Sequence, residues 1–181
     1  MQALSYQNNT FDIKEPFSGL FTQGMVCHET YKDQNNNWVS PDEIITIDGG
    51  KFLKENQEPV KIGASESMSK SKRNTIDPEK IINDYGADSA RLFILSDSPP
   101  EKDVQWSDEG IKSSYKFLQK LWILHLNIKD KLTEEKNETE DDLDLNKFTN
   151  QLIYKITNNL ESFSYNVIIA NMYETYNFLI K

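Results

Sequence analysis

The stretch from Gly63 to Pro78, GASESMSKSKRNTIDP, most strongly limits what this chain can fold into. Its cations are Lys70, Lys72 and Arg73, and four serines lie among them. Directly before a helix-start signal, these residues predict a loop that leads into a helix N-terminus. Small residues, hydroxyl groups and ammonium groups together suit a bound anion. The sequence therefore predicts a cradle for a phosphate chain or, on composition alone, a solvated basic loop without a ligand.

The residues on either side of this loop define its ends. Val60 to Ile62 is a short apolar run that predicts the last strand of a sheet. Asp77 followed by Pro78 is typical of a helix N-cap and the first helical residue. A strand on one side and a helix start on the other would hold a mobile loop, and such loops often close over a ligand.

Apolar runs before the loop predict further strands. Residues up to about Phe17 are polar, and we expect them to be loose or weakly helical. Strands are expected at Leu20–Val26, Trp38–Val39, Ile44–Ile47 and Lys51–Leu53. Asp48-Gly49-Gly50 between the last two is a strong hairpin signal. Cys27 and His28 are adjacent, so a strand would place them on opposite faces, which favours packing over a metal or catalytic pair.

Helical signals follow the loop. A first helix is expected to end at Gly86, and a second, from Asp88 to about Ser96, to be almost fully buried. Ser107 is expected to cap a long helix just after Trp106, which should pack into a domain joint. The apolar stripe of this long helix is Ile111, Tyr115, Leu118, Trp122, His125, Ile128 and Leu132. A histidine on this stripe predicts a buried, hydrogen-bonded side chain rather than a ligand.

The C-terminal third has an acidic segment and two more helical patterns. Glu134 to Asp144 contains seven acids and one lysine, which predicts an exposed linker. Leu145 to Leu160 predicts one amphipathic helix, and a second is expected after a cap at Ser164 or Asn166. With the long helix these predict an antiparallel bundle. The last pattern has no helix stop signal, so we expect the chain to be part of a longer protein.

Charge and cysteine content limit the partners and the compartment. The net charge of −9 argues against nucleic-acid binding by the chain as a whole, but most of the excess acid lies in 134–144. The segment from Lys61 to Arg73 is locally positive. The single cysteine, Cys27, excludes an internal disulfide and a cysteine-based zinc site, and it suits a reducing cytoplasm. No apolar run is long enough to cross a membrane, so we expect a cytoplasmic protein without a membrane partner.

The order of residues in the loop resembles a known signature. Met68-Ser69-Lys70-Ser71 is similar to the last four residues of the Lys-Met-Ser-Lys-Ser motif of class I aminoacyl-tRNA synthetases. Three further blocks, in the same order, resemble leucyl-tRNA synthetase of the bacterial and organellar type: FTQGMVCHETYK, WVSPDEI and YGADSARLFILSDSPPEKDVQWSDEGI. The resemblance extends over nearly the whole chain, and four collinear blocks are far more specific than one short motif.

The sequence also departs from that family. Ser67 stands where the motif has its first lysine, so one cation is missing. The two histidines, His28 and His125, do not lie in a His-Ile-Gly-His-like segment, and an editing domain and a zinc-binding insertion are absent. At 181 residues, the chain is expected to be a fragment of such an enzyme.

The resemblance implies a fold and a division into domains. The fold class is an α+β fragment, in which a partial Rossmann-type catalytic domain with a β-hairpin and the signature loop precedes an antiparallel helical bundle. Residues 1–76 would be the C-terminal remnant of the catalytic domain. Residues 77–106 would form a helical connecting region, and residues 107–181 the start of the anticodon-binding domain.

The resemblance also implies a function. It is that of a leucine–tRNA ligase, which activates leucine with ATP and transfers it to tRNA(Leu). Lys70 matches the second lysine of the motif and would be the catalytic residue, while Met68, Ser69, Lys70 and Ser71 would contact ATP, with Mg²⁺ accompanying the nucleotide. The fragment alone is expected to be inactive. Two alternatives stay open: a non-catalytic helical module that binds tRNA or protein, and a stable domain fragment with no activity of its own. Separately, exposed strand edges in the first sixty residues predict self-association of the fragment.

Overall fold

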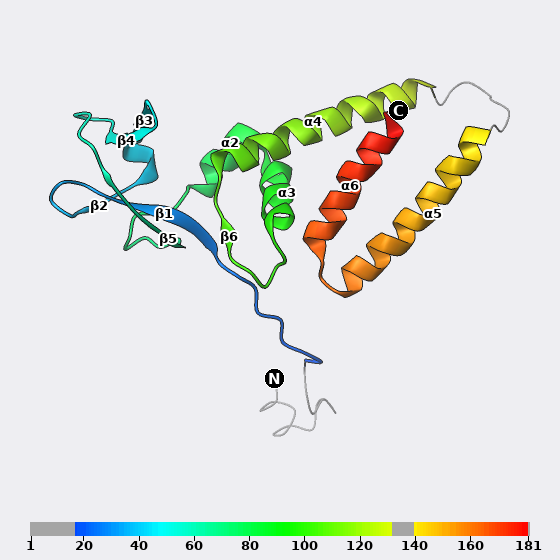
Figure 1. The fold of residues 1–181 in the computed structure, drawn as a ribbon, viewed down its shortest axis with the longest axis horizontal. Coiled ribbons are helices and arrows are strands. Elements are labelled where there is room, and N and C mark those ends of the chain that lie inside the picture. The colour runs from blue at the N-terminus through cyan, green and yellow to red at the C-terminus, as the bar shows by residue number, and fades with distance from the viewer. Residues whose placement is uncertain (1–16, 132–139, 181) are drawn as a thin grey trace, which may run out of the picture.

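The computed structural model describes residues 17–131 and 140–180. Within these ranges the chain is a mixed α/β fold, with a small sheet at one side and five α-helices (Figure 1). The predictions made for residues 1–16, for Leu132 and for the first part of the acidic segment fall outside the described residues. None of the described helices is long and apolar enough to cross a membrane.

Strand β1 (Val26–Lys32) is the centre of the main sheet. Along one edge it pairs antiparallel with β5 (Lys61–Ser67). Its other edge is shared by β2 (Trp38–Val39), which is antiparallel, and by β6 (Val104–Gln105), which is parallel. These two short strands lie at opposite ends of β1. The strand β6 follows the basic loop in the sequence, yet it pairs with β1, which precedes that loop.

The strand predicted at Leu20–Val26 is wrong, because β1 begins only at Val26. The residues before it are held by the loop around Pro100 instead of by a strand. The Gly24 N–H donates to the Pro100 carbonyl at 2.8 Å, and the Met25 N–H donates to the Asp103 carboxylate at 2.8 Å. Gly24 lies against the backbone of Lys102 with no space for a Cβ atom, so glycine is required for this close approach.

The predicted hairpin is confirmed as a second, two-stranded sheet. β3 (Ile44–Ile47) pairs antiparallel with β4 (Gly50–Leu53), with Ile44 opposite Leu53. Asp48 and Gly49 form the turn with φ angles of 48° and 82°, as a two-residue hairpin turn requires. A short 3₁₀ helix, η1 (Pro41–Glu43), connects β2 to this hairpin.

The strand before the basic loop is longer than predicted. Instead of ending at Ile62, β5 continues to Ser67, because these residues pair with β1 as far as Cys27. The loop proper therefore comprises residues 68–77. The predicted helix start at its end is confirmed: the Asp77 side chain accepts the Glu79 N–H, and α2 (Pro78–Tyr85) begins there and ends at Gly86, whose φ is 81°.

Helix α3 (Ala87–Asp97) ends before the two prolines but is less buried than predicted. Its buried residues are Ser89, Leu92 and Phe93, while Leu95 is 38% exposed. Phe93 joins a core with Ile81, Val104 and Ile111, and Trp106 packs against it with ring centroids 5.4 Å apart. This core connects the sheet to three helices. The two-residue strand β6 beside it was not predicted from the sequence.

Helix α4 (Asp108–Lys131) begins as predicted, because the Ser107 hydroxyl accepts the Gly110 N–H at 3.1 Å. The apolar stripe predicted for it is only partly buried. The covered face is Ile111, Ser114 and Phe117, whereas Trp122 is 64% exposed. The prediction of a buried His125 is wrong, since this side chain is exposed. Among the α4 side chains that the structure describes, the fully buried ones lie in the N-terminal half, against α3 and the C-terminal helix.

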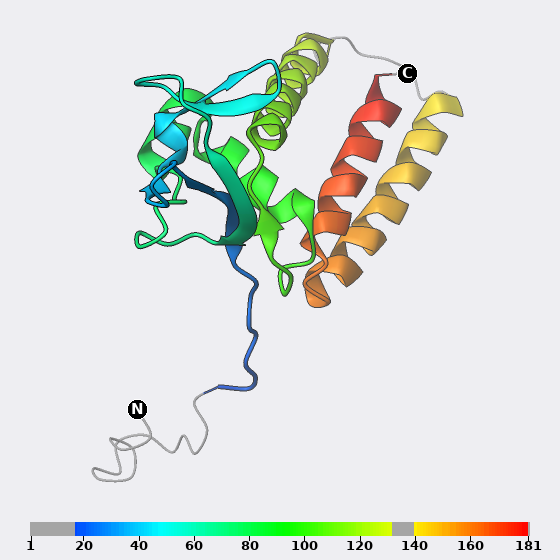
Figure 2. The ribbon, with the colours of Figure 1, turned by 60° about the vertical axis from the view of Figure 1, so that its left-hand side comes forward.

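The last two helices form an antiparallel hairpin on the side of the molecule opposite the sheet (Figure 2). They are α5 (Glu140–Glu161) and α6 (Tyr165–Leu179), and Ser164 is the N-cap of α6, as predicted. From residue 140 onward the predicted acidic linker is in fact helical. Ile169 of α6 packs with Leu92 and Phe117 in a second core, so α6 lies between α5 and α3.

Candidate phosphate-binding site

The basic loop, residues 68–77, leaves the end of β5 and returns to the start of α2. Lys70 and Ser71 are exposed at its outer part, while Met68 and Ser69 are half-buried. The four residues of the predicted site are contiguous, and the turn that follows comprises residues 70–73, closed by the Arg73 N–H donating to the Lys70 carbonyl at 3.3 Å. None of the ion pairs among the described residues includes Lys70. Its ammonium group is presented to solvent.

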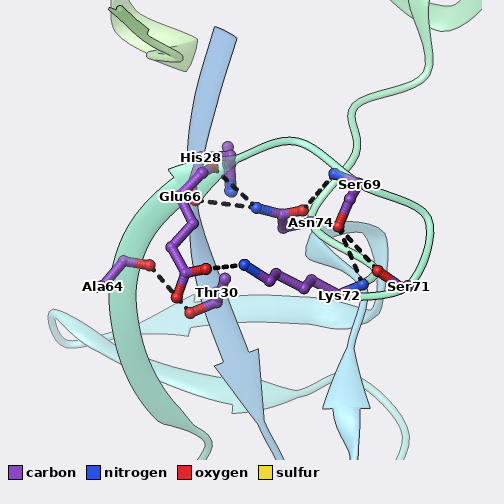
Figure 3. A network of polar contacts seen from close by, with 8 residues as sticks. All are labelled: His28, Thr30, Ala64, Glu66, Ser69, Ser71, Lys72 and Asn74. Atoms are coloured by element: carbon purple, nitrogen blue, oxygen red, sulfur yellow. Dashed lines mark hydrogen bonds and ion pairs between the residues drawn. The ribbon is translucent and has the colours of Figure 1, made fainter. Parts of the chain in front are cut away.

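Asn74 fixes the base of the loop (Figure 3). Its side chain is fully buried, at 0% exposure. Its Oδ1 accepts the Ser69 N–H at 2.9 Å, and its Nδ2 donates to the carbonyls of Glu66 at 3.1 Å and His28 at 3.3 Å. One amide therefore connects the loop to both β1 and β5. Asn74 was not predicted as a site residue, because its only signal in the sequence is an asparagine directly after the basic run.

Lys72 and Arg73 both have carboxylate partners. The Lys72 ammonium pairs with Glu66 on β5, so its side chain points back across the base of the loop (Figure 3). The Arg73 guanidinium donates to the Glu43 carboxylate at 2.9 Å and to the Trp38 carbonyl at 3.3 Å. In this conformation both cations are paired with carboxylates, and neither occupies the position of the motif's first lysine, which is Ser67.

Hydroxyl groups shape the turn around Lys70. The Ser69 and Ser71 hydroxyls lie 3.2 Å apart, and the Lys72 N–H donates to the Ser69 oxygen at 3.3 Å (Figure 3). Both serines are near the surface, so their remaining hydrogen-bonding capacity faces solvent. Residues 69 and 71 therefore flank Lys70 in the chain with hydroxyl groups, which can donate to an anion.

The carboxylate that binds Arg73 is ionised under ordinary conditions. The pKa of Glu43 lies below its usual value of 4.5, chiefly because its side chain accepts the Ser40 backbone N–H and then because of the Arg73 guanidinium. Both contacts favour the charged form of the carboxyl group. The ion pair between η1 and the loop is therefore formed at neutral pH.

The end of the basic loop, Ile76 and Asp77, lines a polar cleft, whereas its outer part does not. This cleft of about 330 Å³ separates the hairpin from α2 and α4, and His28, Asp77 and Lys80 are among its lining residues. Residues 68–71 do not line it. No group of three or more potential metal ligands occurs among the residues that the structure describes. Cys27 is buried, and the His28 Nδ1 lies 2.8 Å from the Glu29 carbonyl, which is consistent with packing.

Comparison with known families first identifies the class. Residues 60–107 match the family of class I tRNA synthetases for isoleucine, leucine, methionine and valine (tRNA synthetases class I (I, L, M and V)). This range contains β5, the basic loop, α2, α3 and β6. The loop that presents Lys70 is therefore part of a class I aminoacyl-tRNA synthetase sequence.

Individual relatives are more specific. The chain is 45% identical over 174 residues to the leucine–tRNA ligase of Parvibaculum lavamentivorans, a match that covers 91% of this chain and 20% of that enzyme. It is 44% identical over 171 residues to the leucine–tRNA ligase of Wolbachia pipientis wMel, a match that covers 93% of this chain and 20% of that enzyme. The chain belongs to the leucyl-tRNA synthetase family, as the resemblance predicted, and spans about a fifth of the length of these relatives.

A solved structure supports the fold. The LeuRS of Agrobacterium radiobacter K84, crystallised as a ternary complex described as LeuRS-tRNA-LeuAMS, superposes with a TM-score of 0.68 over 99% of this chain and 19% of that one. At 22% sequence identity this likeness concerns the fold alone. The mixed α/β arrangement described above is thus that of one part of a leucyl-tRNA synthetase.

Proposed function

We propose that this chain provides the ATP-phosphate-binding loop of a leucine–tRNA ligase, with Lys70 as the catalytic residue. The observation that supports this most directly is the different environment of the three loop cations. Lys72 and Arg73 are paired with carboxylates, whereas Lys70 is exposed on a turn whose base is held by a buried asparagine. A cation held in this way can meet an incoming phosphate without first leaving a protein partner.

The chemistry that such a loop would serve is the activation of leucine. A carboxylate oxygen of leucine forms a bond to the α-phosphorus of ATP, and the bond from that phosphorus to the pyrophosphate oxygen breaks. Negative charge increases on the phosphate oxygens in the transition state, so a cation placed there lowers the barrier more than it tightens ground-state binding. We assign this role to Lys70, with Ser69 and Ser71 donating to phosphate oxygens. Mg²⁺ would arrive with ATP as part of the substrate.

The proposed domain boundaries follow the same assignment. Residues 1–76 would be the end of a Rossmann-type catalytic domain, residues 77–106 a connecting region, and residues 107–181 the first helices of an anticodon-binding domain with an antiparallel arrangement. The packing of α3 against both α4 and α6 makes the connecting region continuous with these helices. β5 is an edge strand of the main sheet, and an unpaired strand edge supports self-association of the isolated chain.

The proposed activity can be tested in a complete enzyme. Residues 1–181 would replace the matching segment of the Parvibaculum lavamentivorans ligase, and ATP–pyrophosphate exchange dependent on leucine would be measured. We expect exchange well above that of the ligase with the segment deleted. A folded hybrid without exchange would contradict the proposal and favour the alternative, a non-catalytic helical module that binds tRNA or protein.

Contact with tRNA is the second part of the proposal, and α4 gives it a specific basis. Lys112, Lys116 and Lys120 are exposed at four-residue intervals, so they form one basic stripe on the helix. Lysines in such a stripe bind a phosphate backbone without reading its sequence.

The stripe predicts how tRNA affinity changes with salt. In a gel-shift titration of the chain with tRNA(Leu) at two salt concentrations, replacing all three lysines with glutamine should weaken binding and reduce its salt dependence. A control that replaces the exposed Lys61, Lys102 and Lys147 changes the net charge equally. Equal losses in both variants would show that total charge matters and that the stripe does not.

A further inference from the structure

The short helix η1 places two neighbouring carboxylates against two segments near the basic loop. Glu43 contacts Arg73 within the loop at 2.9 Å, and Asp42 contacts Lys80 on α2 at 3.1 Å. In the sequence these partners are thirty or more residues apart. One turn of the chain therefore spans the point where the loop joins the helix that follows it.

Glu43 is itself held in place, which makes it a fixed contact point for the loop. One carboxylate oxygen accepts the Ser40 N–H at 2.9 Å, and the other binds Arg73. The turn that carries it is connected to the hairpin: Lys54 donates through its backbone N–H to the Glu43 carbonyl at 2.9 Å and through its ammonium to the Asp42 carbonyl at 2.6 Å. The Glu43 side chain thus has little freedom to follow a moving loop.

A direct path of contacts leads from this carboxylate to Lys70. The Arg73 guanidinium is bound on one side by Glu43 and on the other by the Trp38 carbonyl. The Arg73 backbone is left-handed, with φ of 53°, and its N–H donates to the Lys70 carbonyl at 3.3 Å. A non-glycine residue keeps this backbone conformation only when its surroundings hold it. The side-chain contacts of Arg73 provide such a constraint.

We infer that Glu43 is a positioning residue for the proposed reaction: it holds Arg73, and through the Arg73 backbone it sets where the Lys70 ammonium meets the phosphate chain. The inference rests on the proposed function of Lys70. The competing explanation is that Arg73 binds the phosphate itself. In that case Glu43 would compete with the phosphate for the Arg73 guanidinium.

The two explanations predict opposite effects of the same substitution. In the 181-residue chain, Glu43→Gln and Arg73→Gln would be titrated with inorganic tripolyphosphate, with Glu55→Gln, an exposed position in the turn after β4, as the control. We expect each of the two variants to weaken binding by about two- to fivefold, the range typical of an exposed ion pair, and the double variant to weaken it no further. Arg73→Lys, which keeps the charge, should retain most of the affinity. Tighter binding by Glu43→Gln would overturn the inference.

A second measurement reports on the loop without a phosphate ligand. Trypsin cleavage of the Lys70–Ser71 bond should accelerate in Glu43→Gln by a similar factor, while the thermal unfolding midpoint stays that of the control. Unchanged cleavage would overturn the positioning role whatever the titration shows. The proposed function fails separately, if Lys70→Ala binds tripolyphosphate as well as the unmodified chain.

Discussion

Lys70→Ala is expected to reduce leucine-dependent ATP–pyrophosphate exchange by about 10²–10³-fold in the complete hybrid enzyme, the loss typical when one preorganised group that stabilises transition-state charge is removed. The effect should fall mainly on kcat, because the charge that this ammonium meets increases only in the transition state. The apparent KM for leucine should change little. Steady-state exchange at varied ATP and leucine concentrations measures both parameters.

Two variants control this experiment. Lys70→Arg retains the charge but changes its geometry, so it should recover part of the lost rate. Lys147→Ala removes an exposed cation from α5, outside the loop, and should leave exchange within about twofold, because a distant solvent-exposed charge is largely screened. If Lys70→Ala turned over as fast as the unmodified hybrid, the catalytic assignment would be wrong.

Asn74→Ala is expected to lower the stability of the chain by about 2–3 kcal/mol, because it leaves buried hydrogen-bonding groups without partners. The groups concerned are the Ser69 N–H and the carbonyls of His28 and Glu66. For a chain of this length the unfolding midpoint should fall by about 5–10 °C. Thermal unfolding followed by circular dichroism measures the change.

The chemistry of Asn74 allows a sharper comparison. Asn74→Asp can still accept the Ser69 N–H, but it directs a carboxylate at two carbonyl oxygens, so it should destabilise the chain at least as much as alanine. Asn158→Ala, at an exposed position of α5, should change stability by less than about 0.5 kcal/mol. Equal midpoints for Asn74→Ala and Asn158→Ala would show that the buried amide does not stabilise the loop.

The features that could be predicted from the sequence are those determined by neighbouring residues. The hairpin turn at Asp48 and Gly49 needs two residues that tolerate positive φ, and the start of α2 needs a capping carboxylate before proline. The four residues of the predicted site lie together because they are contiguous. In each case the physical cause lies within a few residues of its effect.

The features that were missed depend on distant segments. The burial of Asn74 arises from its position between two paired strands, and the contact of Glu43 with Arg73 spans 30 residues. The three- and four-residue periodicity of α4 predicted its apolar stripe. It could not show that the residues buried by neighbouring helices are those near the start of α4 and that Trp122 is exposed. His125 is exposed for that reason.

The parallel pairing of β6 with β1 also has a consequence for how the chain folds. Val104 pairs with Val26, so the segment between them, which includes the basic loop and two α-helices, is a long loop closed at its ends by this strand pairing. Contacts between such remote positions carry a large loop-closure entropy and are acquired slowly. The turn that presents Lys70 is therefore expected to reach its final geometry late in folding, once the helices that follow it have docked.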